Sequence, residues 1–202
     1  MRIGLIGLGN MGAGMARNIR AAGFDLTVYD VREEAMAALE RVGASRGPSP
    51  AAVARAVDVV LTSLPGPDQV ASVTVGAEGV LEGIGRDAVL VETSTSRPTL
   101  IREVARRFAA KGAHVLDAPV SGGKEGAENR NLAVMVGGRR EVFDRVRPVL
   151  ELLLAGLSEK EAASRLGLSR HTVHEYTKAL YRAFGVHSRG ELLAQFVSGL
   201  PA

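Results

Sequence analysis

Cysteine is absent from this chain of 202 residues, and so are long apolar runs. Without cysteine the chain has no disulfide, no thiolate chemistry and no cysteine-ligated zinc, which fits a reducing compartment. Glycine and asparagine interrupt the apolar start of the chain, and no run approaches the roughly 20 apolar residues that cross a bilayer. We therefore expect a cytoplasmic protein that does not enter a membrane.

Charge and histidine content say little about function. A net charge of +3 is compatible with a polyanionic partner, but so small an excess is also common in proteins that bind none. The four histidines are scattered along the chain. His171 and His174 are one helical turn apart, yet we expect two exposed side chains there and predict no metal site.

The order of apolar segments indicates an α/β domain followed by helices. Up to about residue 138, short apolar runs alternate with longer amphipathic stretches, as in parallel strands joined by crossover helices. The predicted strands cover residues 3–7, 26–30, 57–63, 89–92, 114–117 and 132–136. Beyond Gly138 every segment has helical spacing. We expect a Rossmann-type doubly wound parallel sheet over residues 1–148 and a small all-α domain over residues 149–202.

A predicted helix over residues 141–155 joins the two parts. Pro148 interrupts its pattern, and marks either a kink or the start of a second helix.

Three glycines form a phosphate-binding turn directly after the first predicted strand. Gly7, Gly9 and Gly12 stand in the order G-L-G-N-M-G, and an amphipathic stretch follows at once. The first glycine permits a tight turn, the second lets the backbone approach a pyrophosphate, and the third allows close packing of helix and strand. The helix N-terminus attracts the phosphates. The residues predicted to hold a dinucleotide are Gly7, Leu8, Gly9, Asn10, Met11 and Gly12.

Asp30, at the end of the second predicted strand, is the predicted partner of the ribose. A carboxylate there accepts hydrogen bonds from the ribose hydroxyls of NAD and repels the 2′-phosphate of NADP. The alternative is that Asp30 caps the next helix, with Glu33 completing a capping box. Because Arg32 lies close enough to bind a 2′-phosphate, NAD is the favoured cofactor and NADP stays open.

Further motifs follow the glycine turn. They are Ser63-Leu-Pro65, Ser94-Thr95 followed by Pro98, Asp117-Ala-Pro-Val-Ser-Gly-Gly123 and Met135-Val-Gly-Gly138. With residues 4–12, they make the first 150 or so residues resemble the cofactor domain of the β-hydroxyacid dehydrogenases, the family of 3-hydroxyisobutyrate and 6-phosphogluconate dehydrogenases.

The resemblance implies roles for particular residues. Leu64 and Pro65 would line the adenine or nicotinamide pocket, and Thr95 would contact the nicotinamide ribose region. The carboxylate of a small hydroxyacid would be bound by Ser121, Gly122 and Gly123, whose backbone amides can form an anion cradle. A simple turn is the alternative for these three residues.

The catalytic part of the family pattern is missing. Family members carry a lysine as general acid or base, in a G-x-x-x-K-x-x-N stretch of a second, all-helical domain, and this chain has no such stretch. Such assistance contributes about 10²- to 10⁴-fold in rate. Lys124 is a nearby substitute, but we expect it to be a solvated loop charge. No catalytic residue is assigned, and we expect very weak turnover at best.

The last fifty residues carry a different signature. Ser158 and Glu161 form a capping box, residues 167–169 make a turn, and Ser169 caps a second helix. From residue 149 the segment resembles the helix-turn-helix DNA-binding domain of the LuxR family of transcription regulators. The resemblance implies contact with double-stranded DNA through Ser169, Arg170, His171, Thr172, His174, Lys178 and Arg182.

Several points qualify this resemblance. His174 stands where the family usually has a lysine, and Glu175 brings a negative charge near the DNA. A solvated polar face on a helical bundle is the alternative. The apolar stripe over residues 189–200 implies a homodimer on a two-fold site, or else packing within the monomer.

Three interpretations are compatible with these signatures. The leading hypothesis is a DNA-binding transcription regulator whose first domain binds NAD(H). The alternative is an NAD(P)-dependent oxidoreductase, weakly active alone or completed by another subunit. An accidental fusion is the third, because one apolar face of the helix over residues 141–155 cannot easily pack against both the sheet and the helical module.

Overall fold

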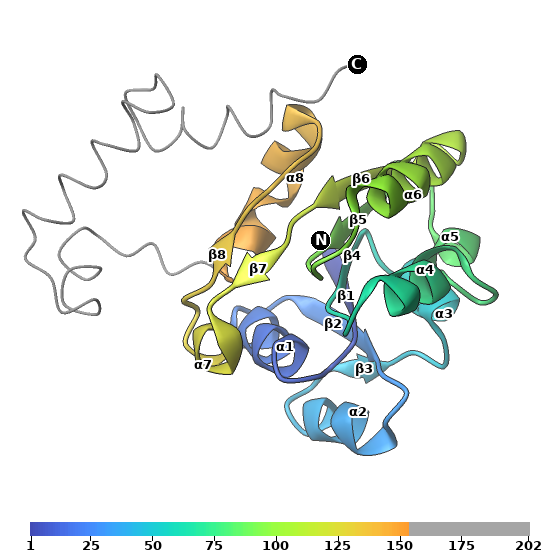
Figure 1. The fold of residues 1–202 in the computed structure, drawn as a ribbon. Helices are drawn as coiled ribbons and strands as arrows, with labels where there is room; N and C mark the ends of the chain where they lie inside the picture. The colour runs from blue at the N-terminus through green and yellow to red at the C-terminus, as the bar shows by residue number, and fades with distance from the viewer. Residues whose placement is uncertain (154–202) are drawn as a thin grey trace, which may run out of the picture.

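The computed structural model describes residues 1–153, so the predicted DNA-binding segment lies outside the described residues apart from its first five. Figure 1 shows how the elements are arranged. In chain order they are β1 (Arg2–Ile6), α1 (Gly12–Ala21), β2 (Asp25–Tyr29), α2 (Glu33–Glu40), β3 (Ser45–Arg46), α3 (Pro50–Ala56), β4 (Val59–Thr62), α4 (Pro67–Val75), α5 (Val80–Gly83), β5 (Val89–Glu92), α6 (Pro98–Ala110), β6 (His114–Asp117), β7 (Val120–Ser121), α7 (Gly123–Glu128), β8 (Ala133–Val134) and α8 (Arg140–Glu151).

Six parallel strands form one sheet in the order β3-β2-β1-β4-β5-β6. The chain builds β2 and β3 on one side of β1 and then returns to build β4, β5 and β6 on the other side. Strand order therefore reverses between β1 and β4, and all carboxyl ends lie at one edge. This is the Rossmann arrangement, in which a dinucleotide binds across the point of reversal. The predicted fold class is confirmed for this part of the chain.

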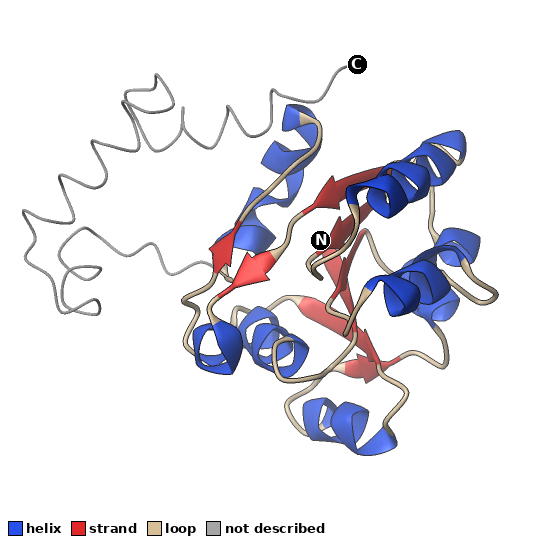
Figure 2. Ribbon diagram, in the orientation of Figure 1, coloured by secondary structure: helices blue, strands red, loops and turns tan. Residues whose placement is uncertain are grey.

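Helices cover both faces of the sheet, as Figure 2 shows. On one face Leu5 and Leu61 belong to a core that includes residues of α1 and α8. On the other face Val60 and Leu90 belong to a core that includes residues of α3 and α6. Strands buried on both faces need near-continuous apolar runs, which explains why β1, β4 and β5 were visible in the sequence.

Five of the six predicted strands are confirmed as β1, β2, β4, β5 and β6, whereas the strand predicted over residues 132–136 is shorter and is not part of the parallel sheet. Only Ala133–Val134 is extended, and this β8 pairs antiparallel with β7 in a separate two-stranded sheet. Strand β7 follows almost directly after β6, and the short helix α7 connects it to β8. The chain therefore adds a second, two-stranded sheet here and no seventh parallel strand. Strand β3 was not predicted, because its two residues are exposed and do not belong to an apolar run.

Helix α8 extends past the expected domain boundary at residue 148. Pro148 lies inside it on the exposed side, so it does not start a second helix. The buried face carries Val142, Val146, Val149 and Leu150, and Leu153 lies beyond the helix end in the same core. The apolar face of α8 is thus occupied by the sheet domain.

Over residues 1–153, no helix combines the length and the apolar character that crossing a membrane requires. Within the same span, no cluster of three or more histidine, aspartate or glutamate side chains is arranged to hold a metal ion.

Candidate dinucleotide-binding site

The glycine turn connects three neighbouring strands. Gly7 follows β1 with φ of +90°, a backbone conformation that glycine adopts without strain, and its amide donates to the carbonyl of Tyr29 at 2.9 Å. A side chain at Gly7 would collide with the carbonyl of Ser63 after β4, and one at Gly12 would collide with the carbonyl of Gly7. These two positions are therefore restricted to glycine by the packing of the protein itself.

The third glycine of the turn is different. A Cβ at Gly9 would meet no atom within 4 Å, so nothing in the protein requires glycine there. The space beside Gly9 is open in front of α1, whose first turn has no acidic residue and whose N-cap Met11 makes no side-chain capping bond. Free amides at a helix N-terminus attract anions. The open glycine and the uncapped helix together form a cradle that a diphosphate would fill.

Asp30 lies beside this turn and does not cap a helix. Helix α2 begins at Glu33 with Arg32 as its N-cap and has no side-chain capping bond, so the capping alternative is wrong. One carboxylate oxygen of Asp30 instead accepts the amide N–H of Leu8 at 2.6 Å, and the other accepts that of Arg32 at 2.9 Å. The predicted ribose partner is thus fixed to the phosphate-binding turn.

Burial and hydrogen bonding act on the Asp30 carboxyl in opposite directions. Burial by itself raises the pKa of Asp30, but the Arg32 guanidinium and the amides of Arg32 and Leu8 outweigh it and hold this pKa below its usual value. Asp30 is therefore a carboxylate at neutral pH, as a ribose partner has to be.

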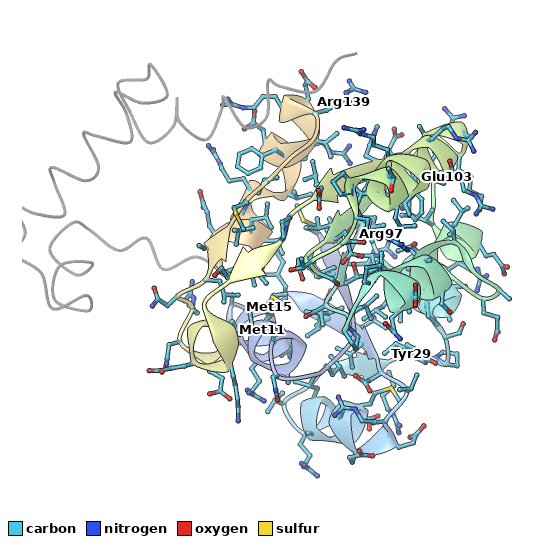
Figure 3. All side chains as sticks on the ribbon, viewed as in Figure 1. Met11, Met15, Tyr29, Arg97, Glu103 and Arg139 are labelled. Atoms are coloured by element: carbon cyan, nitrogen blue, oxygen red, sulfur yellow. The ribbon has the colours of Figure 1, made fainter. Side chains whose placement is uncertain are left out.

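The loops after β4 and β5 lie side by side on the other half of the edge. The amide of Leu64 donates to the hydroxyl of Ser94 at 2.8 Å, which brings the loop of Leu64 and Pro65 against the loop of Thr95. Pro65 and Thr95 are exposed and Leu64 is half-buried. Figure 3 labels Met11, Tyr29 and Arg97, which lie respectively just before α1, at the end of β2 and just before α6.

A row of polar residues at this edge escaped the sequence analysis. Thr62, Glu92 and Asp117 end β4, β5 and β6 and pair in register across them. Glu92 is 1% exposed, and its carboxylate accepts the Thr62 hydroxyl at 2.6 Å and the Ser94 amide at 2.8 Å. Burial raises the pKa of Glu92 and also that of Asp117. The sequence did carry a signal for them, because each of these polar residues ends an apolar run.

The Ser-Gly-Gly segment occupies the turn between β7 and α7. Gly122 and Gly123 have φ of +137° and +63°, and Ser121 is exposed. The following α7 packs on α1, where Asn18 donates to the carbonyl of Ala127 at 2.7 Å. Lys124 is exposed and lies 3.9 Å from Glu128. The structure thus places this segment beside the first helix of the nucleotide-binding unit.

The seven predicted DNA-contacting residues lie outside the described residues. The family matches together span residues 2–195 and so include these seven.

Two family profiles match. Residues 2–158 match the profile described as the NAD binding domain of 6-phosphogluconate dehydrogenase. Residues 144–195 match the profile of bacterial regulatory proteins of the luxR family. The two matches overlap over residues 144–158, a stretch that begins inside α8.

Similar proteins are dehydrogenases. The 3-hydroxyisobutyrate dehydrogenase of Pseudomonas aeruginosa is 41% identical over 149 residues, covering 74% of this chain and 50% of the relative. The mitochondrial 3-hydroxyisobutyrate dehydrogenase of Mus musculus is 37% identical over 151 residues, covering 75% and 45%. A structure of the Mycobacterium tuberculosis 3-hydroxyisobutyrate dehydrogenase with L-serine has a TM-score of 0.71 at 35% identity, covering 76% of this chain and 53% of that one.

The chain spans about half the length of the curated relatives it matches. The family match over residues 2–158 includes the whole of the described α/β domain. On this basis the chain belongs to the family of the NAD binding domain of 6-phosphogluconate dehydrogenase, and it joins that domain to one of the luxR type.

Proposed function

We propose that the chain is a DNA-binding transcription regulator whose first domain binds NAD(H). The observation that carries the proposal is the phosphate cradle at Gly9 and the α1 N-terminus, held against Asp30, in a chain that also matches the luxR family. A binding site for the dinucleotide is thus combined with a DNA-binding module, while the family's catalytic lysine motif is absent from the sequence.

The dinucleotide lies across the carboxyl edge of the sheet in this proposal. Its diphosphate rests on residues 7–12, and Asp30 accepts hydrogen bonds from the adenosine ribose. The nicotinamide half lies over the loops after β4 and β5, near Leu64, Pro65 and Thr95. When bound, the nicotinamide supplies a hydride acceptor or donor. Residues 121–123 offer backbone amides to a small anion such as a hydroxyacid carboxylate.

The DNA contacts fall on the luxR-type segment. We assign them to Ser169, Arg170, His171, Thr172, His174, Lys178 and Arg182, on a helix that enters the major groove. A homodimer would place two such helices on a two-fold site.

An oxidoreductase is the second candidate, favoured by the 41% identity to a 3-hydroxyisobutyrate dehydrogenase. The chain has no G-x-x-x-K-x-x-N stretch, and Lys124, the nearest substitute, is exposed and lies beside Glu128. We therefore expect NADH formation from 3-hydroxyisobutyrate or L-serine by the purified chain to be very slow. Robust turnover would establish the oxidoreductase and displace the regulator as the primary function.

The test of the regulator is selection of bound DNA from a random pool by the full chain, with and without NADH. Enrichment of a two-fold sequence that changes in strength with NADH would support both parts of the proposal. If no sequence is enriched, the chain is not a sequence-specific regulator. If enrichment ignores NADH, the chain binds DNA but does not sense the nucleotide. Alanine at Arg170 or Lys178, compared with alanine at Arg41 at the end of α2 in the first domain, checks the assigned contacts.

A further inference from the structure

The loops that face the nicotinamide side are joined by a buried network. β4 ends at Thr62 and β5 ends at Glu92, and these two residues are paired across the strands. In a Rossmann fold each half of the dinucleotide lies on one side of the point where strand order reverses. Because Asp30 marks the adenosine side on β2, the loops after β4 and β5 face the nicotinamide side.

The carboxylate of Glu92 is the centre of this network. One oxygen accepts the Thr62 hydroxyl at 2.6 Å, and the other accepts the Ser94 amide at 2.8 Å. The Ser94 hydroxyl in turn accepts the Leu64 amide at 2.8 Å. A continuous path of hydrogen bonds therefore runs from the loop after β4, through Ser94 and Glu92, to the end of β4.

A carboxylate is an expensive group to place in the interior of a sheet domain. Burying a charge is unfavourable unless it is hydrogen-bonded, and Glu92 is 1% exposed. Burial raises its pKa, the nearby charge of Asp117 adds to this, and the bonds from Ser94 and Thr62 offset only part of it. An apolar residue here would avoid this cost. A charged acceptor, however, forms hydrogen bonds roughly twice as strong as those of a neutral one.

We propose that Glu92 is a positioning residue that fixes the loops after β4 and β5, and with them Leu64, Pro65 and Thr95, for the nicotinamide and its ribose. The inference rests on the proposed binding of NAD(H). Glu92 acts through Ser94 and Thr62, because its own carboxylate is enclosed by them. The adenosine side is held by other strands, through Asp30 and the Leu8 amide.

This separation of the two halves gives a selective readout. ADP carries the adenosine and the diphosphate but neither the nicotinamide nor its ribose. Glu92→Gln keeps the side-chain size but replaces one acceptor oxygen with a donor, so it disturbs the two loops and leaves residues 7–12 and Asp30 intact. A merely structural role would weaken NADH and ADP alike.

The experiment is calorimetric titration of the full chain with NADH and with ADP. For Glu92→Gln we expect the Kd of NADH to rise on the order of tenfold, with the Kd of ADP within about twofold of wild type. Ser94→Ala should give the same pattern, and the double variant should be little worse than either, because both act through one network. The control is Thr74→Val, which removes a buried hydroxyl bonded only to the Val70 carbonyl of its own helix, and should change neither Kd.

The outcomes separate this inference from the function on which it rests. A wild-type chain that binds both ligands, with a Glu92→Gln variant that keeps NADH or loses both equally, would overturn the positioning role alone. A wild-type chain that binds neither ligand would overturn the proposed nucleotide binding, and the positioning role with it. Should Glu92→Gln not fold, Thr62→Val removes one donor from the same carboxylate and has to show the same selective loss.

Discussion

The guanidinium of Arg32 donates to both carboxylate oxygens of Asp30, with Nε 3.0 Å from Oδ1 and Nη2 3.2 Å from Oδ2. The same carboxylate accepts the Leu8 amide of the phosphate-binding turn. A bound NAD would place its ribose hydroxyls at this carboxylate, while the 2′-phosphate of NADP would have to take Arg32 away from it. We therefore expect the pair to set the preference between the two cofactors.

Asp30→Asn should shift that preference toward NADP(H). The amide removes the charge that repels a 2′-phosphate and holds Arg32, and it weakens the bonds to the ribose. Hydrogen bonds to charged groups contribute about 1.5–3 kcal/mol, so we expect NADH to bind roughly 10- to 100-fold more weakly. NADPH should lose much less, or gain. The measurement is calorimetric titration with both cofactors.

Asp25→Asn is the matched control, because Asp25 is exposed at the opposite end of the same strand. It should leave both affinities unchanged. Equal losses of NADH and NADPH in Asp30→Asn would show that the carboxylate only supports the turn and does not discriminate between the cofactors.

Gly9→Ala and Gly12→Ala should separate cofactor binding from stability. A methyl group at Gly9 meets no protein atom, so the unliganded variant should melt within about 1 °C of wild type. It would occupy the space of the diphosphate, and NADH affinity should fall at least about tenfold. A methyl group at Gly12 collides with the Gly7 carbonyl and should cost about 1–3 kcal/mol of stability as well.

Thermal melting and NADH titration of both variants check this pair. Unchanged NADH binding by a well-folded Gly9→Ala variant would mean that the diphosphate does not approach this glycine.

Helix α8, within which the overlap of the two family matches begins, should be required for the stability of the first domain. Val142, Val146, Val149, Leu150 and Leu153 are all buried in the sheet core. At about 1.5–3 kcal/mol for each fully buried side chain, the five contribute on the order of 7–15 kcal/mol, as much as the whole stability of a typical domain. A fragment of residues 1–153 should therefore fold and bind NADH, whereas residues 1–138 should not fold.

Point variants in the full chain give a second measure of α8. Leu150→Ala should lower the stability by about 2–5 kcal/mol, and alanine at the exposed Arg147 should change it by less than about 0.5 kcal/mol. If residues 1–138 melt like residues 1–153, then α8 is not part of this domain's core.

The sequence predicted the parts of this fold that depend on local pattern. The strands β1, β2, β4, β5 and β6 are apolar runs, and the turn at Gly7 and Gly12 is a backbone requirement that only glycine meets. The parallel pairing expected for residues 132–136 was wrong because a short apolar run looks the same in a separate two-stranded sheet and in a central parallel strand. Only the pairing of β8 with β7 distinguishes the two, and pairing is a long-range property.

The place of Asp30 beside the glycine turn was predictable, because a strand end and a glycine turn are both read from local pattern; its contact with a ribose stays a prediction. The positioning role proposed for Glu92 could not be predicted from the sequence. It depends on Thr62 of the neighbouring strand and on the bond between Leu64 and Ser94, which only the folded arrangement brings together. The ion pair of Arg32 with Asp30 was likewise not predicted. The sequence showed only that Arg32 lies close enough to bind a 2′-phosphate, and its bond to Asp30 depends on the turn between them.

The two acidic residues at the edge of the sheet, Glu92 and Asp117, should make the stability of the domain fall as pH rises. Burial raises the pKa of both Asp117 and Glu92, and the charge of Asp117 raises that of Glu92 further. The folded state then holds its protons more tightly than the unfolded state does. This contribution is fully present below the unfolded pKa values of about 4 and is lost as pH rises through the higher folded values. Asp117→Asn removes the Asp117 charge, so the variant should be more stable than wild type at pH 7 and equal to it near pH 3.

Asp58→Asn supplies a control of opposite sign. The hydrogen bond from the Arg2 side chain lowers the pKa of Asp58, so this group contributes stability above its unfolded pKa and loses it as pH falls through the folded value. The Asp58→Asn variant should therefore be slightly less stable than wild type at pH 7 and equal at low pH. Denaturant unfolding of the three proteins between pH 3 and pH 8 measures both differences. A stability difference for Asp117→Asn that stays constant over this range would show that packing, and not the burial of charge, governs this position.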